Sequence, residues 1–275
     1  MTIDNIREIV ESDLELKDLE LNNFDLLTAY QYIQIRGTIV DGYKPVLKTK
    51  PYIEISYQPT EDEIERLNKE RFLKSLELFN SAVYLQEANF NNFNVNTNDR
   101  KNALDRAVNF CNDYIKGNHR KGLYIYGRFS TGKSYLTSAI AHELFNNGYN
   151  VLFTFMPDLV RAIKDGINQN DLEYRVNALR NCDVLILDDI GGENMSAWFR
   201  DEVLLPILQF RLNAKKPVLF SSNLKLEQLV EKMDVQRNKI SSYSAARVIQ
   251  RIIDLSDFVS IGDLPYSKIK ENEYE

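Results

Sequence analysis

Eight residues near the middle of the chain have the types and spacing of a phosphate-binding loop. The stretch "GRFSTGKS", residues 127–134, fits the pattern G-x-x-x-x-G-K-[ST], and the apolar run "GLYIY" precedes it. In such a loop, backbone N–H groups and the positive end of the following helix hold phosphate groups. We therefore expect a nucleotide site formed by Gly127, Arg128, Phe129, Ser130, Thr131, Gly132, Lys133, Ser134 and Tyr135.

Two side chains of this loop have separate expected roles. Lys133 would reach the β- and γ-phosphates, and the Ser134 hydroxyl would bind Mg²⁺. The alternative is a chance glycine-rich turn with a solvated lysine. The strand pattern before the loop and the helix pattern after it favour the phosphate site, with ATP and Mg²⁺ as its occupants.

A second stretch, "VLILDDIGGE", supplies the carboxylates that nucleotide hydrolysis needs. Val184 to Leu187 predict a buried strand, whose end would deliver Asp188 to the Mg²⁺ ion, partly through water, and Asp189 to the γ-phosphate as the catalytic base. Glu193, after a flexible glycine pair, is a weaker rival for the base. Two aspartates after a strand are otherwise an ordinary loop start or helix cap.

A further strand pattern, "PVLFSSN", ends in Asn223. In nucleotide switches that insert a strand between the loop strand and the acidic strand, a polar residue at this point contacts the γ-phosphate and the attacking water. Asn223 fits that catalytic role. The alternative is that Ser221, Ser222 and Asn223 only cap the next helix.

The elements that must position these residues alternate along the second part of the chain. Five apolar strand patterns, "GLYIYG", "NVLFTF", "DVLILDDI", "PVLFSSN" and "DFVSI", are separated by amphipathic helical patterns. This order predicts an α/β fold with a parallel five-stranded sheet that helices cover on both faces.

The first part of the chain has a different character. Residues 1–90 combine acidic helical patterns with the short β-like region "KPVLKTKPYIEISYQP", which predicts a small α+β domain. The Asn-rich stretch "EANFNNFNVNTNDR" then interrupts the pattern and is typical of a connector that packs Phe90 and Phe93 locally. We place the domain boundary there, with domains at residues 1–95 and 96–275.

Composition and charge exclude several classes of protein. No apolar stretch approaches the roughly 18 residues of a membrane span, and the acidic first 25 residues do not resemble a secretory signal, so a cytoplasmic protein is expected. The net charge of −6 belongs to the front: residues 1–97 contain 10 Lys and Arg against 17 Asp and Glu, and residues 98–275 contain 24 against 23. A local basic groove for DNA therefore remains possible in the second part.

Together these stretches resemble the AAA+ helicase loaders of DNA replication, the DnaC/DnaI/IstB-like ATPases. The resemblance runs through "GLYIYGRFSTGKSYLTSAIAHEL", "VLILDDIGGENMSAWFRDEVLLPILQFRL", "PVLFSSNLKLEQL" and "SAARVIQRI". It implies an AAA+ P-loop domain and an ATPase that uses hydrolysis as an assembly switch. It also implies binding of a DnaB-type replicative helicase through residues 1–97, delivery of that helicase to single-stranded DNA, and self-association through AAA+ interfaces.

Residues 1–97 depart from this family in one respect. The N-terminal domain of such loaders carries a cysteine-rich zinc site, but residues 1–97 contain neither Cys nor His. We therefore expect this domain to fold without zinc. The departure leaves open how closely the domain follows its relatives in binding the helicase. In the phosphate loop, Ser130 stands where relatives tend to have glycine.

The resemblance also implies an arginine that acts on a neighbouring subunit's nucleotide. Arg247 and Arg251 in "SAARVIQRI" lie four residues apart, on one face of a predicted helix. We expect Arg247 to be this arginine finger, with Arg251 as its rival and Arg200 as a third candidate. The alternative is that the pair only binds acids such as Asp254.

Single-stranded DNA contacts are expected on the helical pair "PDLVRAIKDGINQNDLEYRVNALR". Its position matches the extra helices of initiator-type AAA+ proteins, so Arg161, Lys164 and Arg175 are hypothetical contacts. The alternative is a solvated charged helix face. For the whole chain, the alternative function is an IstB-like ATP-binding helper of DNA transposition. A metabolic P-loop kinase is disfavoured by the inserted strand and by the lack of a substrate-binding insert.

Overall fold

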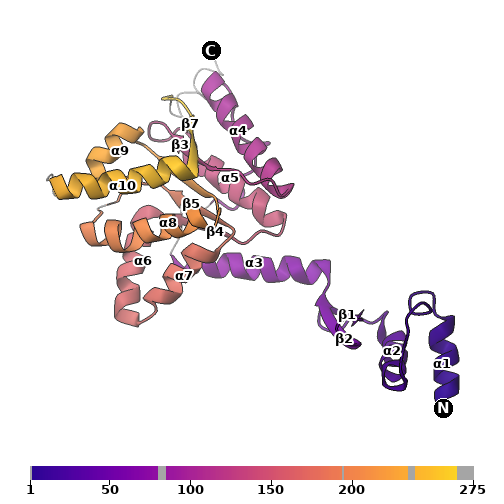
Figure 1. Cartoon of the computed structure of the whole chain (residues 1–275). Coiled ribbons are helices and arrows are strands. Elements are labelled where there is room, and N and C mark those ends of the chain that lie inside the picture. Colours follow the sequence, from indigo (N-terminus) through magenta and orange to yellow (C-terminus); the bar gives the residue numbers. More distant parts are fainter. Residues whose placement is uncertain (1, 80–84, 194, 235–238, 265–275) are drawn as a thin grey trace. The chain divides into compact units, whose positions relative to one another are not determined.

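A computed structural model describes residues 2–79, 85–193, 195–234 and 239–264 of the 275-residue chain. The chain divides into two compact units, residues 1–67 and residues 68–275 (Figure 1). This division falls earlier than the predicted boundary at residue 95. The reason is that Phe72, Phe79 and Phe93 are buried in the cores of the second unit, so the Asn-rich stretch belongs to that unit.

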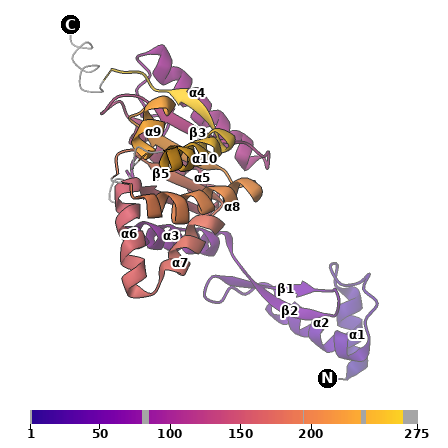
Figure 2. The same ribbon diagram turned by 60° about the vertical axis from the view of Figure 1, so that its left-hand side comes forward.

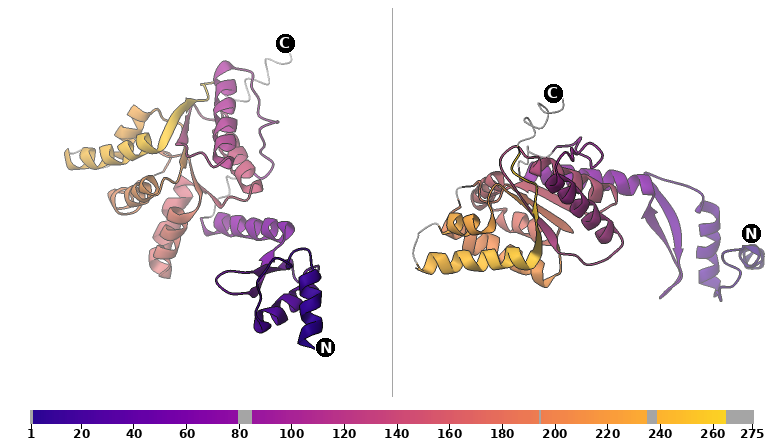
Figure 3. Two further views of the ribbon diagram at one scale, coloured as in Figure 1. Left: turned by 45° about the vertical axis from the view of Figure 1, so that its right-hand side comes forward. Right: turned by 90° about the horizontal axis from the view of Figure 1, so that it is seen from above.

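The first unit is a small α+β fold, as predicted. Its helix α1 (Ile3–Ser12) packs against α2 (Asn23–Ile35), and α2 in turn packs against an antiparallel hairpin of β1 (Tyr43–Lys48) and β2 (Glu54–Pro59) (Figure 3). Asn22 begins α2 with a capping box, since its side chain accepts from the N–H of Asp25 and the Asp25 carboxylate accepts from the N–H of Asn22. The unit has its own apolar core of Ile6, Val10, Leu16, Leu26 and Ala29. Helix α3 (Glu61–Leu78) continues the chain into the second unit.

The second unit contains the predicted parallel sheet of five strands. The strands are β3 (Gly122–Tyr126), β4 (Val151–Phe155), β5 (Val184–Asp188), β6 (Val218–Ser222) and β7 (Ser256–Ser260), in the order β4-β5-β6-β3-β7. All neighbouring pairs are parallel. The strand β6 lies between β3 and β5, so the strand insertion expected from the sequence is confirmed.

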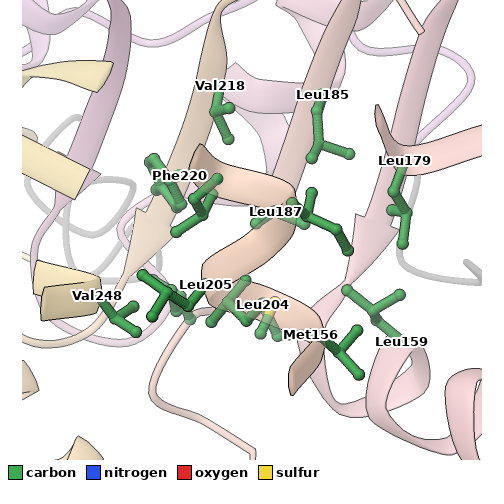
Figure 4. Close-up of a cluster of buried hydrophobic side chains, with 14 of the residues drawn as sticks. Met156, Leu159, Leu179, Leu185, Leu187, Leu204, Leu205, Val218, Phe220 and Val248 are labelled. Carbon is green, nitrogen blue, oxygen red and sulfur yellow. The ribbon is translucent and has the colours of Figure 1, made fainter. Parts of the chain in front are cut away.

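Helices cover both faces of this sheet (Figures 1 and 2). Helices α4 (Asn98–Ile115) and α5 (Lys133–Asn146) pack on the face formed by residues such as Ile125 and Ile186. The opposite face packs on α6 (Met156–Gln169), α7 (Leu172–Asn181), α8 (Leu205–Asn213), α9 (Leu226–Met233) and α10 (Lys239–Leu255). Figure 4 shows this second core, in which Leu187 and Phe220 meet Leu204 and Val248.

The helical segment that follows β5, residues 199–213, has two parts. The first, η1 (Phe199–Leu204), is a π-helix, and α8 follows it with Pro206 in its first turn. Proline has no N–H to donate to the preceding turn, so the regular α-helical bonding is interrupted at this place and the wider π turn accommodates the interruption. The interruption lies inside one continuous helical rod, which is why the sequence pattern did not reveal it.

Candidate nucleotide site

The loop between β3 and α5 has the backbone shape that its glycines allow. Gly132 has φ 95°, and Ser130 adopts φ 59°, so both lie in the left-handed region. Gly127 packs so closely that a Cβ there would lie 2.5 Å from the carbonyl oxygen of Gly262. With its left-handed φ, Ser130 adopts a backbone conformation that glycine adopts with less strain. This gives a physical reason for the glycine that the resembled family tends to have at position 130.

The Lys133 side chain lies inside the phosphate loop, residues 127–134. Its side chain is buried, and Nζ donates hydrogen bonds to the carbonyl oxygens of Gly127 at 3.0 Å and Arg128 at 2.7 Å. Burial lowers the pKa of the Lys133 ammonium below its ordinary value. Because the Lys133 ammonium is buried in a low-dielectric environment beside neutral carbonyls, its attraction to phosphate oxygens is only weakly screened.

The predicted Mg²⁺ residues lie together at the carboxyl end of β5. The Asp188 carboxylate is fully buried and accepts hydrogen bonds from Ser134 Oγ at 2.7 Å, Ser221 Oγ at 2.6 Å and Thr137 Oγ1 at 3.1 Å. Hydroxyl and carboxylate oxygens next to a phosphate site are the ligand types that Mg²⁺ prefers. Within the described part of the chain, no cluster of three or more His, Cys, Asp or Glu side chains could hold a metal ion. The oxygens of Ser134 and Asp188 fit a Mg²⁺ that also binds nucleotide phosphates, as this ion usually does.

Asp189 and Asn223 form a pair at the edge of the same site. Asn223 Nδ2 donates to Asp189 Oδ1 at 2.5 Å, and the backbone N–H of Asp189 donates to Ser221 Oγ at 2.9 Å. Asp189 has φ 60°, a strained conformation for a residue with a side chain. Burial, and then the neighbouring Asp188 carboxylate, raises the pKa of Asp189 above its ordinary value.

Glu193, the weaker candidate for the base, lies outside the pocket. Its side chain is buried and its Oε2 accepts a hydrogen bond from the N–H of Gly191 at 2.7 Å. Burial raises the pKa of this carboxyl to about 7. Glu193 therefore stabilises the loop that follows Asp189, and of these two carboxylates Asp189 is the one that lines the cavity.

A cavity of about 840 Å³ joins these groups. Its volume is within the range of sites for nucleotide-sized ligands. Loop residues line it together with Asp189, Ser221 and Asn223. The cavity is also lined by residues that the sequence did not assign to the site: Leu85, Asn92, Phe93, Asn94, Arg100 and Phe155. The spacing of Phe90 and Phe93 in the Asn-rich stretch predicted that this stretch packs locally. It did not predict that the stretch lines the nucleotide cavity.

The three candidate arginine fingers have different surroundings. Arg247 is exposed on α10, and none of the residues described in the structure forms a hydrogen bond or ion pair with it. Arg251 donates to Asp254 at 2.7 Å and to Gln209 at 2.6 Å, which is the ion-pair arrangement considered as its alternative. Arg200 is 2% exposed and binds Asp201 and the carbonyl of Met233, so it cannot reach a neighbouring subunit in this conformation.

The candidate DNA contacts also differ from one another. Arg161 and Lys164 are exposed on α6, with Arg161 donating to Asp158 at 2.8 Å. Arg175, in contrast, is buried and binds Asp171, Gln169 and the carbonyl of Leu78. The expectation that Arg175 contacts DNA is therefore not compatible with its position, because its guanidinium holds α7 to the chain around it.

Comparisons with known proteins agree with this geometry. The replicative helicase loader DnaI of Bacillus subtilis (strain 168) is 28% identical over 272 residues, which cover 92% of this chain and 86% of the relative. The replicative helicase loader DnaC of Escherichia coli (strain K12) is 28% identical over 148 residues, which cover 53% of this chain and 59% of that relative. A crystal structure of DnaI superposes with a TM-score of 0.58 at 32% identity, covering 67% of this chain and 92% of that one.

None of the described helices is both long and apolar enough to cross a lipid bilayer. Residues 64–273 match the family described as "IstB-like ATP binding protein", a range that contains the loop, both aspartates, Asn223 and α10. With three quarters of its length inside that match, the chain belongs to the IstB-like ATP-binding protein family.

Proposed function

We propose that this protein is an ATP-dependent loader that binds a DnaB-type replicative helicase and delivers it to single-stranded DNA. The observation that carries the proposal is the extent of the similarity to DnaI. A match over 92% of the chain leaves 8% of 275 residues, about 22, outside, so most of residues 1–67 lie within it. The similarity to DnaI therefore extends into the first unit, residues 1–67. The family match at residues 64–273 leaves that unit almost wholly uncovered.

The second unit supplies the ATPase in this proposal. Backbone N–H groups of residues 129–134 and the Nζ of Lys133 would bind the phosphates, while Ser134 and Asp188 would hold Mg²⁺. The ion would supply positive charge at the β- and γ-phosphates. Asp189 accepts a proton from the water that attacks the γ-phosphorus, and its raised pKa makes it a better base than an ordinary aspartate. Asn223 orients that water beside Asp189.

Assembly completes the site. Arg100 is the arginine that lines the pocket, and it is bound to the backbone of the loop and of residue 94. The proposed finger, Arg247, is exposed and lies outside the residues that line the pocket of its own chain. We assign it to the nucleotide of a second copy, where a guanidinium stabilises charge on the γ-phosphate. Arg161 and Lys164 remain the proposed contacts to single-stranded DNA.

The deciding experiment is capture of the replicative helicase from the same organism. The full chain should retain the helicase, and residues 68–275 alone should not, since the unit proposed to bind it is missing. Zinc content of the full chain, measured by elemental analysis, should be below stoichiometric in the same preparation. A full chain that binds ATP but never retains the helicase would remove the loader assignment.

One other candidate is the IstB-like helper of DNA transposition that the sequence suggested, since the matched family is described as IstB-like. Such a protein would bind a transposase in place of the helicase, with the same nucleotide site. The capture experiment separates the two when both partners are offered to the same immobilised chain. The cytoplasmic location expected from the sequence stays a prediction.

A further inference from the structure

One arginine contacts two of the segments that line the nucleotide cavity. Arg100 leaves the first turn of α4 and is only 2% exposed. Its Nε donates to the carbonyl oxygen of Asn94 at 2.6 Å, and its Nη1 donates to the carbonyl oxygen of Thr131. The guanidinium carbon lies 4.6 Å from the centroid of the Phe93 ring.

These contacts join two segments that line the cavity. Thr131 is part of the phosphate loop, and a Cβ on the adjacent Gly132 would lie 3.3 Å from Nη2 of Arg100. Phe93 and Asn94 belong to residues 85–94, a segment that we call the linker wall and that lines the cavity through Leu85, Asn92, Phe93 and Asn94. A planar guanidinium has donors in a fixed fork, so it can bind two carbonyls in set directions and stack on a ring at the same time.

The linker wall is otherwise held mainly by the helix that follows the loop. Ser138 Oγ accepts from the N–H of Leu85 at 3.2 Å, and Tyr135 Oη accepts from the N–H of Asn89 at 3.4 Å. These two bonds join the wall to α5, and Arg100 joins it to the loop itself. The direction of the Thr131 carbonyl fixes the peptide plane of Gly132, and with it the direction of an N–H that would bind phosphate.

We propose that Arg100 is a positioning residue that aligns the phosphate loop and sets the linker wall against it. The inference rests on the proposed nucleotide site and adds a residue outside the phosphate-loop pattern. Two consequences follow for binding. Arg100 is expected to govern affinity for the triphosphate group even when no nucleoside is attached, whereas Phe93, which lines the cavity and whose ring has no hydrogen-bond donor, is expected to affect affinity for the whole nucleotide alone.

The test compares two ligands, Mg²⁺-ATP and Mg²⁺-tripolyphosphate, by isothermal titration calorimetry on the full chain. In Arg100→Lys, one ammonium replaces the planar fork, so two separate nitrogens no longer donate to Asn94 and Thr131 while the group stacks on the Phe93 ring. We expect about tenfold weaker binding of both ligands, the loss that one hydrogen bond to a charged group accounts for. Phe93→Leu should weaken ATP and leave tripolyphosphate unchanged.

Arg211→Lys is the matched control. Arg211 is also fully buried and donates to backbone carbonyls, among them those of Leu179 and Pro217, but it does not line the cavity. Its variant should lower the melting temperature without changing either affinity. If Arg100→Lys does not fold, Arg100→Gln is measured in its place, with folding checked by circular dichroism.

Three results have distinct meanings. Parent-like tripolyphosphate affinity in a folded Arg100 variant overturns the positioning role while the ATP site stands. An equal loss of affinity in the Arg211 variant overturns it too, because any buried arginine would then have the same effect. A parent chain that binds neither ligand overturns the proposed ATP site itself, and the inference with it.

Discussion

At the scale of single residues, Lys133 is the cation that should face the phosphates. Lys133→Ala removes it from a loop whose shape is set by backbone conformation and glycines, so the fold should remain. We expect ATP turnover to fall by about 100-fold or more, as for loss of a preorganised charge at a reacting group. A phosphate-release assay measures this, with Lys116→Ala as the control, because Lys116 is exposed at the end of α4 and does not line the cavity. Turnover at the parent's rate would show that the loop is not the ATP site.

Gly192 is a second residue with a single clear consequence. A Cβ at this position would lie 2.1 Å from Oδ2 of Asp189, a distance that no real Cβ contact shows. Gly192→Ala must therefore displace the carboxylate that Asn223 holds. We expect turnover to fall by about tenfold to 100-fold while the dissociation constant for ATP changes little. Gly37→Ala is the control, because a Cβ there meets nothing within 4 Å and Gly37, like Gly192, does not have a left-handed φ. An equal loss in both variants would show that the effect does not come from the displaced Asp189 carboxylate.

The buried carboxyl of Glu193 makes a prediction about pH. Its pKa is raised to about 7 from an ordinary 4.5, so the folded protein holds this proton more tightly than the unfolded chain does. The resulting stabilisation is fully present below pH 4.5 and is lost as the pH rises through about 7. Glu193→Gln keeps a neutral side chain at all pH values and should remove this loss, a difference of about 1–3 kcal/mol. Urea unfolding at about pH 5 and about pH 8 measures it. An identical pH dependence in parent and variant would contradict the assignment.

At the scale of elements, most of the fold followed from sequence patterns. Apolar runs such as Val184–Leu187 have no alternation, and only a strand buried on both faces explains them at that length. The positions of Ser134, Asp188 and Asn223 followed too, because parallel strands end at one edge of a sheet. Their meeting in one hydrogen-bonded group is therefore a property of the predicted topology.

The linker wall shows what the patterns missed. Residues 85–94 form neither helix nor strand, so periodicity carries no signal there, and Phe93 is buried by contacts with residues far along the chain. The role of Arg100 was hidden for the same reason, since a charged residue in the first turn of a helix is ordinary in sequence. Long-range burial of this kind depends on the folded shape and not on local pattern.

The division of the chain gives a prediction at this scale. A fragment of residues 98–275, cut near the predicted boundary, lacks three buried aromatic residues of the second unit: Phe72, Phe79 and Phe93. Each buried Phe contributes about 2 kcal/mol, and their sum approaches the total stability of a typical domain. We expect residues 68–275 to fold and bind ATP, and residues 98–275 to aggregate or to bind at least tenfold more weakly. Equal melting temperatures and affinities for the two fragments would restore the boundary at residue 95.

At the scale of the whole molecule, the exposed Arg247 predicts cooperation between copies. Arg247→Ala should bind ATP normally but lose any ATPase that depends on protein concentration, DNA or helicase. Mixing it with Lys133→Ala should restore some turnover, because each variant supplies the group that the other lacks. Arg251→Ala is the comparison: its side chain is already bound to Asp254, so its mixture should show no recovery. If only the mixture of Arg251→Ala with Lys133→Ala recovered turnover, Arg251 would be the arginine finger. If a dilute Arg247→Ala chain lost ATP binding, Arg247 would act on the nucleotide of its own chain.

The position of β3 in the sheet has a consequence for folding during translation. Both neighbours of this strand, β6 and β7, come later in the chain, and the N–H of Ile261 donates to the carbonyl of Tyr126 at 2.9 Å just before the phosphate loop. On the ribosome, residues 1–67 can bury their own core early, but β3 waits about 130 residues for its last partner. A chain truncated before residue 256 would contain the complete phosphate-loop sequence. It would lack β7, the edge strand that pairs with β3. Until translation is nearly finished, the apolar strand β3 is a substrate for chaperones and proteases.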